Sequence, residues 1–177
     1  LTLLLQLSGD SHPEVRIAAA YYMGIRNRVS YVPRLVEMLR DDDDAVRRYT
    51  CEALLRMNQT PTFAAMKRSL QSADRFEAWA ARRLLERIPA TEWRDEVLST
   101  DNHRLFIQGA LALMIAQPTR ENGLAITHRV TELMPTYIND RDFTDILRVE
   151  QVALLRGGIG PGEVEVLAKC GCQPTIL

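Results

Sequence analysis

Two segments of the chain repeat the same plan at an interval of 31 residues. Residues 10–19 and 41–50 each begin with an acidic turn and continue into a helical pattern that carries Val-Arg at the same place. A fixed interval near 30 with helix–turn–helix content is typical of stacked-helix proteins, whose units bury their apolar faces only against one another. We therefore predict an all-α fold, an α-α superhelix in the form of a right-handed solenoid of about five helix pairs.

The interval can be followed further along the chain, although it becomes less regular. Glycine commonly follows the last residue of a helix, so the first repeated helix is predicted to stop at Gly24. Aligning Phe76 with Val46 gives an interval of 30, and aligning Leu105 with Phe76 gives 29. The next matching helix, residues 143–156, comes after an interval of 41. The alignment predicts that Phe76 and Leu105 occupy the same core position as Val46.

The repeats are expected to form a single domain over residues 1–177, with regular repeats over 7–117 and less regular helices over 118–177. The chain does not begin with Met, and residues 1–7 are mostly leucine, as at the end of a helix whose partner is missing. One interpretation is that the chain is a fragment of a longer protein. Another is that this apolar N-terminal edge mediates self-association.

Composition excludes several classes of protein. With 46% hydrophobic residues the chain can bury a core, and the 22 basic and 23 acidic residues nearly cancel. Dedicated nucleic-acid binders usually carry a basic excess, so the charge balance argues against that partner. No stretch has the roughly 18 to 20 apolar residues needed to cross a bilayer, so no membrane insertion is expected. The compartment is not identified, and a soluble, cytoplasmic protein is the default expectation.

Reactive side chains do not form a recognisable motif. The three histidines lie far apart in the sequence, and phosphate-binding loops, nucleophile elbows and haem-attachment motifs are missing. Cys51 falls in the apolar pattern of a helix and is interpreted as a small core residue. Cys170 and Cys172 lack the partners that a redox or metal site requires. We therefore predict no enzymatic activity and no catalytic, cofactor-binding or metal-binding residues.

The turn and helix motifs resemble one repeat family. Residues 10–16 read Asp-Ser-His-Pro-Glu-Val-Arg, an alanine-rich helix follows, and residues 43–47 read Asp-Asp-Ala-Val-Arg. This pattern resembles HEAT repeats of the short kind found in phycobilisome-lyase-type proteins. The resemblance is specific over residues 7–70, extends to about residue 117 and is weak thereafter. It implies a structural ladder that confers no activity, in which Asp10 bonds with Arg16, and Asp43 or Asp44 bonds with Arg47.

The resemblance and the missing motifs favour a non-enzymatic protein-binding or scaffold module whose partner is not identified. By resemblance, the second helix of each pair lines the binding surface. The candidate residues on these helices are Arg34, Glu37, Lys67, Arg68, Arg94 and His128. Two alternatives remain open. One is an accessory HEAT domain of a larger multidomain bacterial enzyme of the redox type, and the other is a nucleic-acid-binding HEAT-like protein that uses local arginine clusters.

Overall fold

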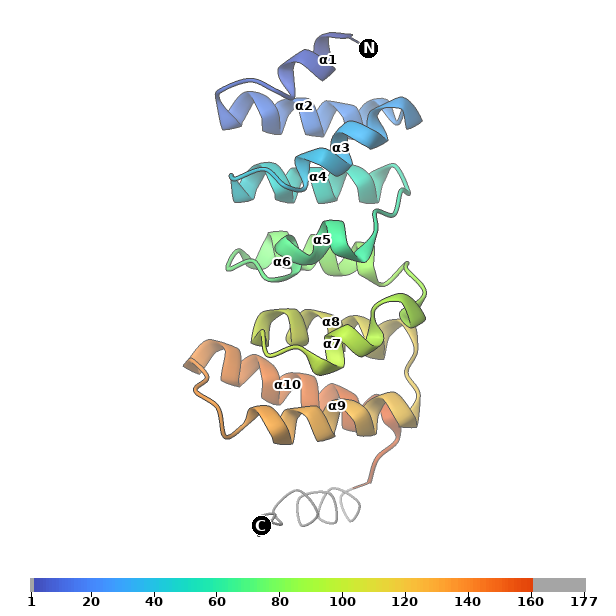
Figure 1. The fold of residues 1–177 in the computed structure, drawn as a ribbon. Coiled ribbons are helices and arrows are strands. Elements are labelled where there is room, and N and C mark those ends of the chain that lie inside the picture. The colour runs from blue at the N-terminus through green and yellow to red at the C-terminus, as the bar shows by residue number, and fades with distance from the viewer. Residues whose placement is uncertain (1, 161–177) are drawn as a thin grey trace. The chain divides into compact units, whose positions relative to one another are not determined.

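The computed structural model describes residues 2–160, and every regular element that these residues form is a helix (Figure 1). The first six are α1 (Thr2–Leu7), α2 (Pro13–Arg26), α3 (Val32–Met38), α4 (Asp44–Arg56), α5 (Phe63–Leu70) and α6 (Arg75–Leu85). The others are α7 (Arg94–Ser99), α8 (His103–Ala116), α9 (Arg120–Leu133) and α10 (Asp140–Gly157). Short 3-10 turns over Val29–Tyr31 and Ala90–Glu92 precede α3 and α7. The prediction of an all-α helical repeat is confirmed.

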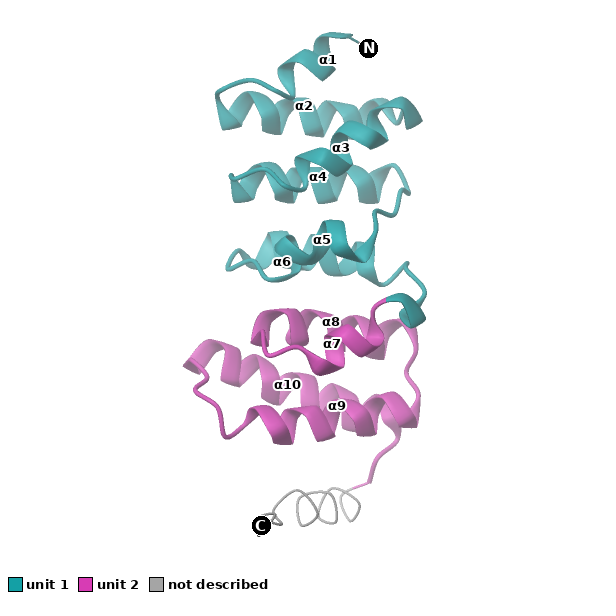
Figure 2. Cartoon of the chain, in the orientation of Figure 1, with its two compact units in different colours: residues 1–92 teal, residues 93–177 magenta. Residues whose placement is uncertain are grey.

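Internal contacts divide the chain into two compact units (Figure 2). Unit 1 is Leu1–Glu92 and unit 2 is Trp93–Leu177. Each unit has its own buried core, for example Leu35, Leu54 and Leu84 in unit 1. That residues 1–177 form a single domain stays a prediction.

Unit 1 is built on a row of three helices. Helix α2 packs on α4, and α4 packs on α6, while α3 packs on α4 and α5 packs on α6. Figure 1 shows α3 and α5 in front of this row, so the first and second helices of the repeats form two layers. Helix α1 packs on α2.

Polar side chains at the turns determine where the helices of unit 1 begin. Asp43 accepts a hydrogen bond from the backbone amide of Val46 at 2.9 Å, and Asp74 accepts bonds from the amides of Phe76 and Glu77 at 2.8 and 2.7 Å. Such N-caps satisfy amides that have no partner within the helix. Because the two caps are 31 residues apart, they fix an interval of 31 between α4 and α6.

This interval corrects the predicted alignment of Phe76 with Val46. The residue that occupies the place of Val46 in α6 is Glu77, and both side chains are fully buried. Phe76 is 45% exposed instead. The alignment followed hydrophobicity, whereas the N-cap at Asp74 sets the register and places a carboxylate at a core position.

The predicted helix end at Gly24 is also wrong. Helix α2 continues to Arg26 and ends at Asn27, which adopts the left-handed conformation with φ of 48°. Gly24 instead allows α2 and α4 to approach closely, since a Cβ atom there would lie 2.9 Å from the Cα of Ala53. Asparagine tolerates the left-handed region because its short side chain can bond locally, so it can end a helix as glycine does.

Unit 2 has a different arrangement. Helix α10 packs on both α8 and α9, and α7 packs on α8. Glycines allow close helix approach there: a Cβ atom at Gly109 would lie 2.4 Å from Val97, and one at Gly123 would lie 2.9 Å from the carbonyl oxygen of Ala153. Packing of this kind needs small residues at isolated positions and does not impose a fixed interval on the sequence.

Candidate binding surface

Two arginines near the starts of α2 and α4 connect successive repeats of unit 1. Arg16 donates to both carboxylate oxygens of Asp41 at 2.8 Å, and Arg47 donates to those of Glu77 at 2.6 and 3.0 Å. Each arginine also donates to a carbonyl oxygen in the turn before its own helix, Asp10 at 2.9 Å for Arg16 and Asp41 at 2.7 Å for Arg47. The planar guanidinium therefore joins one turn to the next repeat.

The carboxylate partners differ from those that the resemblance implied. The carboxylate of Asp10 accepts a hydrogen bond from the backbone amide of His12 at 2.8 Å, and that of Asp43 caps α4. Asp44 lies in the first turn of α4. The arginines take their carboxylates from the following repeat, Arg16 from Asp41 and Arg47 from Glu77.

The ion pairs of the ladder are satisfied and largely shielded. The side chains of Arg47 and Glu77 are 8% and 0% exposed. Burial opposes ionisation of Asp41, but hydrogen bonds from Arg16 and from the Asp43 amide outweigh it and lower the pKa of Asp41. Burial also opposes the charge of Arg47, and the bonds to Glu77 outweigh that effect and raise the pKa of Arg47. These groups hold the repeats in register and are not free to bind a ligand.

The predicted surface residues of unit 1 lie on α3 and α5, and several of them make internal contacts. Arg34 donates to the hydroxyl and the carbonyl oxygen of Ser8, both at 2.8 Å, and to Glu37 at 2.9 Å. Arg68 donates to the carbonyl oxygen of Arg40 at 3.1 Å. Lys67 likewise interacts with other residues of the protein. Arg34 and Arg68 each neutralise the carbonyl end of the preceding segment, a favourable place for a cation.

The other two predicted residues belong to unit 2. Arg94 donates to the amide oxygen of Asn122 at 2.8 Å, and the His128 ring, 71% exposed, lies 3.5 Å from Glu132. The neighbouring Arg129, which the sequence analysis did not single out, donates to the carbonyl oxygen of Thr100 at 3.0 Å, as Arg68 does to Arg40. The six predicted residues are thus divided between the two units, and a common binding role for them remains a proposal.

Large apolar side chains gather instead on the first helices of unit 1. On α2, Tyr21, Tyr22 and Ile25 are 39%, 53% and 51% exposed, and on α6 Phe76 and Trp79 are 45% and 49% exposed. The rings of Tyr21 and Tyr22 meet edge to face, with centroids 5.4 Å apart. Single exposed apolar residues are normal on a protein surface, whereas several on one row of helices are a candidate for an interaction site.

Arginines of α4 and α6 lie over one ring of each aromatic group. The guanidinium of Arg56 lies 5.3 Å from the ring centroid of Tyr21, and those of Arg48 and Arg75 lie 4.7 and 4.6 Å from that of Phe76. Arg48 and Arg56 are about two turns apart on α4, so this helix contacts a ring of α6 through one arginine and a ring of α2 through the other. We define the aromatic–arginine surface as Tyr21, Tyr22, Ile25, Arg48, Arg56, Arg75, Phe76 and Trp79.

Sequence reasoning missed this surface because it treated apolar side chains as core. A signal was available, since Tyr21 and Ile25 are four residues apart on α2 and continue away from the buried positions Ala20 and Met23. The spacing defines a second apolar face on α2. A helix with two apolar faces packs one of them on the core and leaves the other for a second packing partner.

Comparison with known proteins identifies the family of the N-terminal part of the chain. A family model described as HEAT repeats matches residues 1–86. These residues therefore belong to the HEAT-repeat family, as the resemblance predicted. HEAT repeats generally mediate protein interactions or scaffolding, and their fold is typically non-catalytic. No curated protein matches the sequence.

The described residues offer neither a metal-holding cluster nor a bilayer-crossing helix. Within residues 2–160, no group of three or more His, Cys, Asp or Glu side chains is placed to hold a metal ion. None of the helices in that range combines the length and the hydropathy that a bilayer crossing needs. Cys170 and Cys172 lie outside the described residues.

Proposed function

We propose that the chain is a non-catalytic protein-binding module that uses the aromatic–arginine surface of unit 1 to hold a partner protein. The observation that carries the proposal is the gathering of five half-exposed large apolar side chains beside three arginines on one row of helices. Tyrosine, tryptophan and arginine are the residues that contribute most binding energy in protein interfaces, particularly where they form a central cluster.

The physical state of these side chains suits binding. Tyr21 and Trp79 have few rotatable bonds, so their immobilisation loses little conformational entropy for the area that they cover. The stacked arginines are already held over the rings, which reduces the ordering that binding requires. Helix packing within unit 1 makes the surface a rigid platform, whose partner would bind without rearranging the helices.

This choice of surface differs from the second-helix surface implied by family resemblance. Arg34 and Arg68 already bond to carbonyl oxygens of neighbouring turns, so recruiting them would break bonds that support the fold. The rings of Tyr22 and Trp79 can be covered without breaking a bond between repeats. No specific feature of residues 2–160 favours the accessory-domain or the nucleic-acid alternative, and among those residues many arginines are already paired with carboxylates.

Affinity capture tests the proposal. The purified chain and its Tyr21→Ala/Trp79→Ala variant are incubated with lysate of the source organism, and retained proteins are quantified by mass spectrometry. Tyr137→Ala is the matched control, because Tyr137 is 91% exposed in unit 2 and its removal deletes an aromatic ring elsewhere. Each protein retained by the wild type is then purified and its direct affinity is measured.

We expect a protein that binds directly to the wild type and to Tyr137→Ala, and at least about tenfold more weakly to the double variant. Equal affinity for all three proteins contradicts the choice of surface. A retained nucleic acid whose binding falls steeply with salt would favour the nucleic-acid alternative instead.

A further inference from the structure

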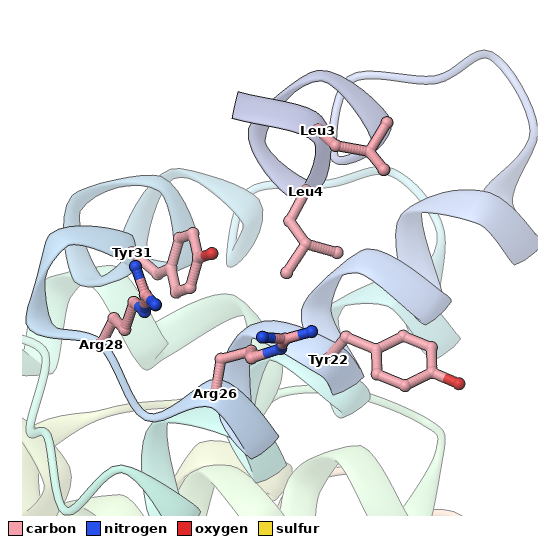
Figure 3. A pocket seen from close by; sticks show the side chains of 6 residues that line it. All are labelled: Leu3, Leu4, Tyr22, Arg26, Arg28 and Tyr31. Carbon is pink, nitrogen blue, oxygen red and sulfur yellow. The ribbon is translucent and has the colours of Figure 1, made fainter. Parts of the chain in front are cut away.

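A small pocket opens beside the aromatic–arginine surface. Its walls come from α1, from the C-terminal part of α2 and from the 3-10 turn Val29–Tyr31, and its volume is about 270 Å³ (Figure 3). The pocket lies entirely within unit 1. The lining residues are Leu3, Leu4, Tyr22, Arg26, Arg28 and Tyr31.

The pocket has an unbalanced positive charge. Among residues 2–160, the side chains of Arg26 and Arg28 have no hydrogen-bond or ion-pair partner, whereas Arg16 and Arg47 are bound to carboxylates. None of the six lining residues is acidic. The carbonyl end of α2 contributes only about half a negative charge against two guanidinium groups, so the pocket attracts an anion. A guanidinium binds carboxylates and phosphates with two parallel hydrogen bonds, and the carboxylate is the one that unmodified protein side chains carry.

The rest of the pocket is apolar. Figure 3 shows Leu4 directed from α1 into the space between Tyr31 and Tyr22, with Arg26 across from it. Tyr31 is 2% exposed and forms a firm wall, while Leu3 is 65% exposed and leaves apolar surface uncovered at the rim. A group that suits this lining carries a carboxylate next to an apolar chain.

Size and position indicate where such a group comes from. Pockets for whole drug-sized ligands usually measure about 300 to 1,000 Å³, so this one accommodates a pair of side chains more readily than a cofactor. Tyr22 belongs both to the pocket and to the aromatic–arginine surface, so one partner can occupy both.

We infer that the pocket receives an acidic side chain and a neighbouring apolar side chain of the partner protein. This inference rests on the proposed function and adds the chemistry of the partner: a segment in which aspartate or glutamate lies beside a leucine-like residue. Arg26 and Arg28 bind the carboxylate, and Leu3, Leu4 and Tyr22 cover the apolar side chain.

The probe is a short fluorescein-labelled peptide that alternates glutamate and leucine, compared with the same peptide carrying glutamine. Fluorescence anisotropy gives the affinities, and NMR spectra of the arginine Nε–H groups locate the site. The glutamate peptide is expected to bind about tenfold more tightly than the glutamine peptide and to shift two arginine signals. Those two signals should be missing from spectra of Arg26→Gln/Arg28→Gln, which should lose the preference for glutamate.

Arg40→Gln/Arg156→Gln is the matched control, because it removes the same charge from exposed arginines outside the pocket. Thermal unfolding confirms that both double variants are folded. Equal affinity for the two peptides, or an unchanged preference in Arg26→Gln/Arg28→Gln, overturns the inference. In a competition experiment, octanoate is added to the peptide complex. Complete displacement of the peptide would overturn the assignment to a polypeptide, since a free carboxylate with an apolar chain would then suffice.

The two proposals fail separately. The peptide probes the pocket alone, so its failure to bind would leave capture through Tyr21 and Trp79 intact. Unchanged capture by Tyr21→Ala/Trp79→Ala would contradict the proposed function while peptide binding at Arg26 and Arg28 could still be measured.

Discussion

Glycines allow close helix approach in both units, at Gly24 in unit 1 and at Gly109 and Gly123 in unit 2, but both bidentate arginine–carboxylate pairs of the ladder lie in unit 1. In unit 1, Arg16 and Arg47 reach carboxylates of the following repeat, and the interval between the repeats is 31 residues. In unit 2, Gly109 and Gly123 allow helices to approach until a methyl group would collide with the neighbour. A bidentate ion pair demands a particular residue at a particular place in each repeat, so it leaves a period in the sequence. Contacts of small residues demand only the absence of a side chain, and no period results.

The largest effect is expected from breaking the ladder at its most buried pair. Glu77→Ala leaves the guanidinium of Arg47 buried without its carboxylate, and loss of one partner of a buried pair costs about 3 to 5 kcal/mol. Chemical denaturation measures the loss in the free energy of unfolding. The rate at which Cys51 is alkylated shows whether the lost stability belongs to unit 1. Burial raises the pKa of this thiol to about 12 and keeps it unreactive until the unit opens. A loss below about 1 kcal/mol would show that the ladder does not hold the repeats.

In unit 2 the corresponding change adds a methyl group where glycine is required. Gly123→Ala places a Cβ 2.9 Å from the backbone oxygen of Ala153, which cannot rotate away, and the expected net loss is about 1 to 3 kcal/mol. The gain in helix propensity offsets part of the clash. Gly157→Ala is the control at the same interface, since its nearest contact would be 3.3 Å and it should lose less. If both variants are as stable as the wild type, close helix approach is not what organises unit 2.

A smaller effect is expected on how the stability of unit 1 depends on pH. The pKa of Asp41 is lowered from its usual 3.8 because the bonds from Arg16 and the Asp43 amide outweigh burial. A lowered pKa means that ionised Asp41 stabilises the folded state well above pH 3.8, and that this contribution is lost as the pH falls through the folded-state pKa. The stability difference between the wild type and Asp41→Asn should therefore shrink on acidification. A difference that stays constant with pH would contradict the role of the ionised carboxylate.

The smallest effect is expected at an exposed ion pair of unit 1. Arg48 and Glu52 are about one-third exposed and lie one turn apart on α4, so Glu52→Ala should cost no more than about 0.5 kcal/mol. Denaturation under the conditions used for Glu77→Ala measures it. A loss as large as that of Glu77→Ala would mean that burial is not what makes the ladder important.

Much of the fold could be predicted because turns and periods are local signals. The acidic turns before α4 and α6 contain the N-caps Asp43 and Asp74, and the short interval follows from packing one helix pair on the next. The alignment of Phe76 with Val46 failed because a buried carboxylate looks polar in sequence. Only its pairing with Arg47 explains why Glu77 lies in the core.

The candidate surfaces were harder to predict for the same physical reason. Arg34 and Arg68 are charged residues on second helices, and sequence alone does not show that carbonyl oxygens of neighbouring turns already bind them. Tyr22 and Trp79 are aromatic residues on helices that also have a core face, and only the packing of α2, α4 and α6 shows which rings remain uncovered. Burial depends on contacts between repeats, which the local pattern does not specify.

Site-specific photocrosslinking tests the central claim most directly. The crosslinking amino acid p-benzoylphenylalanine is placed at position 79 on α6, at position 37 on α3 or at position 137 in unit 2, and each protein is irradiated in lysate of the source organism. We predict a covalent adduct with one protein from position 79 and none from positions 37 and 137. Adducts that form from position 37 and not from position 79 would contradict the account, because the partner would then lie on the second helices.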